Sequence, residues 1–406
     1  MYSYKSGISA EEHDTFLLKH QQCNLLQSSK WASIKQNWDK DIIGFYEDGR
    51  LVASASILIK KLPLKMTMIY IPRGPIMDYS DYNLVDYIIH SLKKYGRQKN
   101  AIFIKCDPLL PVKHYQAGAV QEDISEDNIT PSAIQFLRKR GLVWSGLTTK
   151  LDQTIQPRLQ ANIYADKFDY QSLSKKTKQA IRTAQNKGID IVIGSEDLLE
   201  DFASLMKKTE DRKHINLRGI DYYRKLLQTY KDNSYITMAI LDLPKRKQAL
   251  KEQLLKEESI KAKFTSDSRE SKIKANQEAI MRIQEELNFI EEEMTSGKEI
   301  LPLAATLSLI FGNTSENLYA GMDDTYRHYQ AALVTWYETA NEAFKRGCRW
   351  QNMGGIENQL DGGLYYFKSR LNPTIEEFAG EFNIPVNPLY KPAMLAYNLR
   401  KKLRSK

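Results

Sequence analysis

Cysteine and histidine are scarce in this chain of 406 residues, and neither is clustered. The three cysteines, Cys23, Cys106 and Cys348, form no Cys-x-x-Cys pair, and the six histidines are scattered. Thiolate metal sites and disulfide frameworks both need such residues at paired spacings. The sequence therefore predicts neither a metal site nor disulfides, and it favours a reducing cytoplasm.

Long apolar runs are also missing. The longest one, Ile300–Phe311, is too short and too interrupted to cross a bilayer. Residues 1–14 lack the apolar segment of a signal peptide, so we expect a cytoplasmic protein without a membrane span. The net charge of +9 and the pI near 9.1 favour a polyanionic partner, which could be nucleic acid, anionic lipid or a phosphorylated substrate.

One charged stretch, residues 243–301, has the seven-residue repeat of a coiled coil. Its second half has apolar residues at steps of three and four, with one polar residue among them. These positions are Ile273, Asn276, Ile280, Ile283, Leu287, Ile290 and Met294. The first half keeps the step of seven only at Leu243, Leu250 and Phe264. Residues 265–271, rich in Ser and Asp, separate the halves, so we expect two helices joined by a turn.

The charges at the ends of this stretch indicate how the two helices meet. The first helix opens with the basic run 245–247, and the second ends with the acidic run 291–293. An antiparallel hairpin, closed on its own seam, places these runs side by side. Residues 245–299 contain twelve basic and twelve acidic residues, so the net charge belongs to the rest of the chain. A solvated helix and a dimeric coiled coil are the alternatives.

The length and the order of the expected elements indicate two domains. Strands at residues 42–46, 51–59, 66–71 and 101–106 and a helix at 81–99 form a first α/β unit, in which residues 109–130 are irregular. A second unit repeats this plan from residue 151. We therefore predict an α/β (α+β) fold with two N-acyltransferase (GNAT)-like domains. Domain 1 comprises residues 1–150 plus about 380–406, and domain 2 comprises 151–242 plus 302–379, with the coiled-coil hairpin 243–301 inserted in it.

Seven motifs follow one another along almost the whole chain. They are residues 26–31 with Lys35 and Trp38, residues 70–75 (Tyr-Ile-Pro-Arg-Gly-Pro), residues 105–108 (Lys-Cys-Asp-Pro), residues 174–188, Thr209 and Arg212 with Arg218 and Tyr222-Tyr223, residues 318–321 (Leu-Tyr-Ala-Gly), and residues 363–368. Together they resemble the Fem (FemABX) family of peptidoglycan-bridge aminoacyltransferases. The opening segment is most similar to the MurM/MurN branch, and the hairpin resembles the helical arm of some family members.

The resemblance implies a reaction and its partners. An aminoacyl-tRNA donates its amino acid to the side-chain amine of the third stem-peptide residue, a lysine, of a cell-wall precursor. In the MurM/MurN branch the precursor is lipid II and the donated residue is Ala or Ser. We therefore expect an enzyme, a monomer, that contacts the anionic inner leaflet of the membrane peripherally. The aminoacyl ester is already activated, so positioning and electrostatics suffice and no cofactor is expected.

Within this resemblance, several residues become candidates for the site. Lys368, expected at the end of an aromatic strand, would stabilise the ester carbonyl or hold the tRNA terminus, and Asp107 is a candidate base. Lys35 and Arg218 would bind the diphosphate of the acceptor. Trp38, Tyr222 and Tyr319 would line the same cleft. The alternatives are surface ion pairs for the cations, core packing for the aromatic residues and a plain turn for Asp107.

Two basic segments could contact tRNA. The helix expected at residues 172–187 has five cations suited to phosphate, namely Lys175, Lys176, Lys178, Arg182 and Lys187. The tail after Lys391 could meet tRNA or anionic headgroups through its own basic residues, which are Arg400, Lys401, Lys402, Arg404 and Lys406.

Two other functions compete with aminoacyl transfer. A coenzyme-A-dependent N-acetyltransferase of the same fold needs a Gln/Arg-x-x-Gly-x-Gly/Ala loop, and residues 351–356 fail at the last position. A non-catalytic tRNA-binding coiled-coil protein needs no pocket, so its cations and aromatic residues would be dispersed over the surface.

Overall fold

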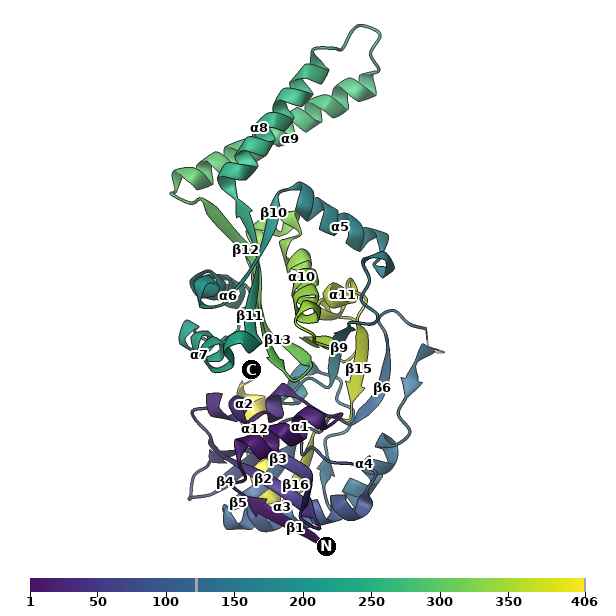
Figure 1. The fold of residues 1–406 in the computed structure, drawn as a ribbon, viewed down its shortest axis with the longest axis vertical. Helices are drawn as coiled ribbons and strands as arrows, with labels where there is room; N and C mark the ends of the chain where they lie inside the picture. The colour runs from purple at the N-terminus through teal and green to yellow at the C-terminus, as the bar shows by residue number, and fades with distance from the viewer. Residues whose placement is uncertain (121–122, 405–406) are drawn as a thin grey trace.

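The computed structural model describes residues 1–120 and 123–404. Two β-sheets lie along the long axis of the molecule, and a helical hairpin projects beyond the second sheet (Figure 1). The two-unit α/β architecture that the sequence predicts is confirmed. Lys406 lies outside the described residues, and so do the side chains of Arg400, Lys401, Lys402 and Arg404.

The first sheet has seven strands in the order β1-β2-β3-β4-β5-β16-β8. Their bounds are Tyr2–Ser6, Asp39–Glu47, Arg50–Lys61, Thr67–Ile71, Ala101–Cys106, Phe382–Pro385 and Val143–Trp144. Helix α3 begins after Asp81, whose side chain accepts the N–H groups of Asn83 and Leu84, and it buries Ile88 and Leu92 against the sheet. The helices of this part are α1 (Ala10–Lys19), α2 (Ser29–Ile34), α3 (Tyr82–Gln98), α4 (Thr130–Lys139) and α12 (Tyr390–Arg404).

The second sheet has nine strands in the order β10-β11-β12-β13-β14-β9-β15-β6-β7. Their bounds are Ile189–Gly194, Ser234–Asp242, Ile300–Phe311, Thr314–Met322, Trp350–Gly355, Leu159–Tyr164, Thr374–Phe378, Pro111–Gln116 and Ser125–Glu126. Its helices are α5 (Lys175–Asn186), α6 (Leu199–Lys213), α7 (Ile220–Tyr230), α10 (Ala331–Lys345) and α11 (Gly363–Ser369). Trp31 and Ile34 of α2 share one buried cluster with α6 and α7, so a helix of the first unit packs on the second.

Each sheet contains one pair of parallel neighbours, β4 with β5 and β13 with β14. The ladder of the second pair is short and joins Thr314–Glu316 to Trp350–Asn352. Beyond it, a Cβ added at Gly354 would lie 3.6 Å from Nζ of Lys368 and 3.9 Å from the carbonyl oxygen of Asn317. The side chain of Lys368 from α11 therefore reaches β14 just beyond the end of this ladder.

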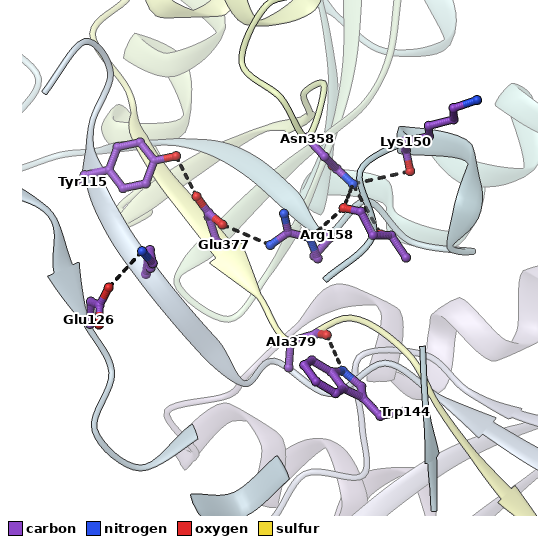
Figure 2. Close-up of polar contacts among 10 residues, drawn as sticks. Tyr115, Glu126, Trp144, Lys150, Arg158, Asn358, Glu377 and Ala379 are labelled. Atoms are coloured by element: carbon purple, nitrogen blue, oxygen red, sulfur yellow. Dashed lines mark hydrogen bonds and ion pairs between the residues drawn. The ribbon is translucent and has the colours of Figure 1, made fainter. Parts of the chain in front are cut away.

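The sequence predicts that residues 109–130 are irregular. This prediction is wrong, because these residues include β6 and β7 of the second sheet. The polar residues of β6 do not predict a strand, and this segment is ordered by its pairing with β15. Figure 2 shows Glu377 of β15 accepting the hydroxyl of Tyr115 at 2.8 Å and Nη1 of Arg158 at 3.0 Å. Trp144 Nε1 donates to the carbonyl of Ala379 at 2.8 Å, where the chain passes from β15 to β16. The division into domains near residue 150 stays a prediction.

The hairpin consists of α8 (Leu243–Lys261) and α9 (Glu270–Thr295), which run antiparallel (Figure 1). Lys247 lies 2.9 Å from Glu291, so the basic and acidic end runs meet as expected. Farther out, the amide of Asn276 donates to the carboxylate of Glu257 at 2.6 Å.

The seam of the hairpin is not closed on itself, however, because its base packs on the second unit. Leu250, Leu287 and Ile290 belong to the buried core of that unit. Arg246 donates to the carbonyl of Asn186 at 3.1 Å as well as to Glu286. The base of the hairpin is therefore part of the folded body, whereas the distal part extends away from it.

Candidate active site

The structure brings Lys35, Arg218, Tyr222 and Tyr319 together from both units. Lys35 follows α2, a helix that Ser28 caps by accepting the N–H of Trp31. Its Nζ lies 4.0 Å from the centre of the Trp31 ring and donates to the Tyr222 hydroxyl at 3.2 Å. The Tyr222 and Tyr319 rings lie 6.2 Å apart, edge to face. These residues, with Trp31, are here called the α2–α7 cluster.

Two cations share one aromatic ring in the α2–α7 cluster. Nζ of Lys35 lies 5.7 Å and Cζ of Arg218 lies 5.1 Å from the Tyr222 ring centre. Burial, and then the charge of Arg218, lower the pKa of Lys35 to about 8. Within residues 1–120 and 123–404, neither cation forms an ion pair with a carboxylate. Two like charges without a counter-ion favour the binding of an anion.

Trp38 does not join this cluster. Its ring packs against Ala32, Leu58 and Tyr70, and Lys60 Nζ lies 5.7 Å from its centre. Three residues after Lys35, the chain has already turned toward β2, so the side chain faces the first sheet. The role of Trp38 in the cleft stays a prediction.

Lys368 lies on helix α11, and not at the end of a strand as the sequence predicts. It is only 5% exposed, and its Nζ donates to the carbonyl oxygen of Gly355 at 2.7 Å. The Trp336 ring centre is 5.6 Å from the same nitrogen. Burial lowers the pKa of Lys368 to about 7, against the opposing effect of Glu357 and with a smaller contribution from Lys213. A lysine that can gain or lose its proton near neutrality is typical of functional sites.

Asp107 is a buried carboxylate directly after β5. It accepts the Tyr70 hydroxyl at 2.9 Å and the backbone N–H of Arg73 at 2.6 Å. Burial raises the pKa of Asp107 to about 6, although the charge and N–H of Arg73 oppose this. Arg73 itself donates to the carbonyl of Pro157 at 3.0 Å, so it supports the turn between the two units. Asp107 is thus held in a fixed position and can exchange a proton near neutral pH.

Of the five cations expected to contact tRNA on this helix, four lie on α5 and Lys187 directly follows it. Lys175, Lys176 and Arg182 are exposed, whereas Lys178 donates to the carbonyl of Gln171 at 2.7 Å. Thr177 of the same helix donates to the carbonyl of Arg370 at 2.9 Å, directly after α11. The buried side of α5 therefore adjoins the helix that carries Lys368, and the cations of α5 lie on its exposed side.

Three residues at or near the site were not predicted from the sequence. Trp31 could have been found, because it stands four residues before Lys35 and so shares its helical face. Glu316 of β13 is buried and accepts the amide of Asn24 at 3.0 Å, which joins the two units. Glu357 binds the first turn of α11. No local pattern distinguishes these two carboxylates from surface residues.

Neither a metal cluster nor a membrane-spanning helix is found in the part of the chain that the structure describes. No three His, Cys, Asp or Glu side chains there are grouped as metal ligands. No helix there is long and apolar enough to cross a membrane. The three cysteines are free thiols.

Comparison with known proteins places the whole chain in one family. The FemAB family model matches residues 8–398. A lipid II:glycine glycyltransferase of Staphylococcus epidermidis is 26% identical over 95% of this chain and 94% of its own length. One of Staphylococcus aureus is 27% identical with the same coverage. The crystal structure of FemX superposes with a TM-score of 0.76 at 25% identity, over 96% of this chain and 99% of FemX. The chain therefore belongs to the FemAB family.

Proposed function

We propose that this protein is a tRNA-dependent aminoacyltransferase that adds an amino acid to the stem-peptide lysine of lipid II. The observation that carries the proposal is the α2–α7 cluster, where Lys35 and Arg218 lie against one Tyr222 ring and form no ion pair with a carboxylate of the described residues. A diphosphate group supplies the missing negative charge, and Arg can bind it with two parallel hydrogen bonds. The relatives named as lipid II:glycine glycyltransferases support this acceptor.

The chemical step needs little covalent machinery. The acceptor amine attacks the ester carbonyl, a negatively charged tetrahedral oxygen forms, and the tRNA 3′ end leaves. In this proposal the ammonium group of Lys368 stabilises that oxygen, in a position where water is largely excluded. Asp107, with its pKa raised to about 6, takes up the amine proton.

The donor approaches over α5. Its exposed cations, Lys175, Lys176 and Arg182, would contact the phosphates of the acceptor stem, and Thr177 fixes this helix to the end of α11. A tRNA bound on α5 would then extend its 3′ end toward Lys368.

The donated amino acid is a separate part of the proposal. The resemblance to the MurM/MurN branch favours Ala or Ser, while the relatives compared above are named for glycine. We also propose that the protein works in the cytoplasm, at the inner leaflet, because lipid II is membrane-linked and the net charge is +9.

The test is a transfer assay with purified protein and lipid II. Separate reactions contain tRNA charged with Ala, Ser or Gly, or acetyl-coenzyme A, and mass spectrometry measures the stem peptide. We expect an aminoacyl increment that depends on intact charged tRNA. An acetyl increment would favour the acetyltransferase. Binding of tRNA without any increment would favour the non-catalytic coiled-coil protein.

A further inference from the structure

Helix α11 lacks a cap of its own. It has only two turns and starts after Gly362, which has no side chain to accept an N–H group. Glu357, five residues earlier, supplies both missing acceptors. Its Oε1 accepts the N–H of Leu364 at 3.0 Å, and its Oε2 accepts the N–H of Tyr365 at 2.9 Å. A helix this short depends on such contacts for its order.

The close approach of Glu357 requires the glycine at position 362. A Cβ added at Gly362 would lie only 2.1 Å from Cδ of Glu357, so any larger residue would displace the carboxylate or the helix. Gly362 leaves the space and Glu357 supplies the acceptors, so together they replace an ordinary capping residue.

The loop that carries Glu357 is itself anchored. Ile356 N–H donates to the carbonyl of Leu159 at 3.1 Å. The amide of Asn358 donates to the carbonyl of Thr148 at 2.8 Å and lies 3.4 Å from that of Lys150 (Figure 2). Glu357 therefore lies between two fixed neighbours, and its carboxylate can transmit that fixed position to α11.

The same carboxylate also interacts electrostatically with Lys368. Burial raises the pKa of Glu357, but the N–H groups of Leu364 and Tyr365 and the Lys368 charge outweigh it, so the pKa is lowered. Around Lys368, Glu357 favours the ammonium form and Lys213, at the end of α6, disfavours it. The other two partners, the Gly355 carbonyl and the Trp336 ring, carry no net charge.

We propose that Glu357 is a positioning residue for Lys368, because its carboxylate fixes the first turn of the helix that carries Lys368. This inference rests on the proposed role of Lys368 in transfer. Glu357 does not contact the reacting atoms, and it acts through the helix and the charge that it holds.

The experiment separates charge from geometry with three variants. Glu357→Gln removes the charge and one acceptor, Glu357→Asp keeps the charge but shortens the reach, and Asp361→Asn is a matched control at an exposed carboxylate of the same loop. Each protein, labelled with carbon-13 at lysine Cε, is titrated by NMR. The Lys368 signal is the one missing from Lys368→Met.

We expect the pKa of Lys368 to fall by about one unit in Glu357→Gln and to stay near the wild-type value in Asp361→Asn. Single-turnover transfer should fall about tenfold or more in Glu357→Gln and in Glu357→Asp. Thermal unfolding checks that each variant is folded. If Glu357→Gln is unfolded, the inference is judged by the transfer rate of Glu357→Asp and by the pKa of Lys368 in that variant.

An unchanged Lys368 pKa and a transfer rate within about twofold of wild type would overturn the inference. If Lys368→Met is slow while Glu357→Gln behaves as wild type, the inference fails and the proposed function stands. If Lys368→Met transfers at the wild-type rate although the Lys368 pKa shifts in Glu357→Gln, the proposed role of Lys368 fails instead.

Discussion

The ammonium group of Lys368 is buried, and the groups in contact with it, the Gly355 carbonyl and the Trp336 ring, carry no charge. The ammonium form predominates below a pKa of about 7 and is lost above it. If that charge stabilises the transition state, Lys368→Met should lower single-turnover transfer on the order of a hundred- to a thousandfold at low pH. Lys368→Arg should recover part of the rate, since it keeps the charge but changes the geometry.

The sign of the pH effect follows from the direction of this shift. The wild-type rate divided by the Lys368→Met rate should decrease as the pH rises from about 6 to about 9, because the wild type loses its charge. Taking the ratio removes the titration of the acceptor amine, which both proteins share. A ratio that is constant over this range would remove the Lys368 charge from the chemical step.

Glu316 makes a second prediction at the residue scale, on stability. Burial raises its pKa to about 7, above the ordinary value of 4.5, so the folded state binds a proton that the unfolded state releases. Its contribution to stability is present below pH 4.5 and is lost as the pH rises to about 7. Glu316→Gln should therefore raise the unfolding free energy relative to wild type at about pH 8, on the order of 1–3 kcal/mol.

Denaturation midpoints at acid and alkaline pH would check this, with Glu47→Gln as an exposed control. The gain from Glu316→Gln should be clearly larger at alkaline pH. The same gain in unfolding free energy at both values of pH would mean that the pKa of Glu316 does not differ between the folded and unfolded states.

At the scale of elements, sequence periodicity predicts long elements well and short ones badly. The hairpin, α3 and α5 have regular apolar spacing, and Ser174 and Asp242 cap their helices as such residues should. In α11, by contrast, the aromatic run before Lys368 favours a strand locally. Glu357 and Gly362 override that preference through a contact that no local pattern encodes.

The hairpin can be tested as two parts. Replacing residues 256–279 by a short Gly/Ser turn removes only the distal arms, and we expect an unfolding temperature within about 3 °C of wild type. Removing residues 245–298 also deletes Leu250, Leu287 and Ile290 from the core. This larger deletion should lower the unfolding temperature much more, because cavities cost several kcal/mol. Equal unfolding temperatures for the two deletions would show that the base contributes nothing.

At the scale of the whole molecule, the candidate site could be predicted only in part. Lys35, Arg218, Tyr222 and Tyr319 come from distant segments, and the family resemblance grouped them before their distances were known. Why they meet is a matter of tertiary packing: α2 of the first unit packs on α7 of the second. The prediction that residues 109–130 are irregular was wrong for the same reason, since β6 pairs with a strand from elsewhere in the chain.

The charge of the whole chain predicts how it behaves at membranes. With a net charge of +9, the protein should cosediment with vesicles that contain anionic lipid, and about 0.5 M salt should release it. Neutral vesicles are the control. Binding that ignores both salt and anionic lipid would contradict an electrostatic peripheral association.

The central claim is a division of labour between the α2–α7 cluster, which binds the acceptor, and Lys368, which acts in the chemical step. Single-turnover and steady-state kinetics of lipid II aminoacylation test it most directly. Lys35→Ala should raise KM for lipid II about tenfold or more while the rate at saturating lipid II stays near wild type, with the exposed Lys30→Ala on α2 as control. Lys368→Met should do the reverse, with a much lower rate and a nearly unchanged KM for lipid II. A Lys35→Ala protein with the wild-type KM, together with a Lys368→Met protein with the wild-type rate, would contradict it.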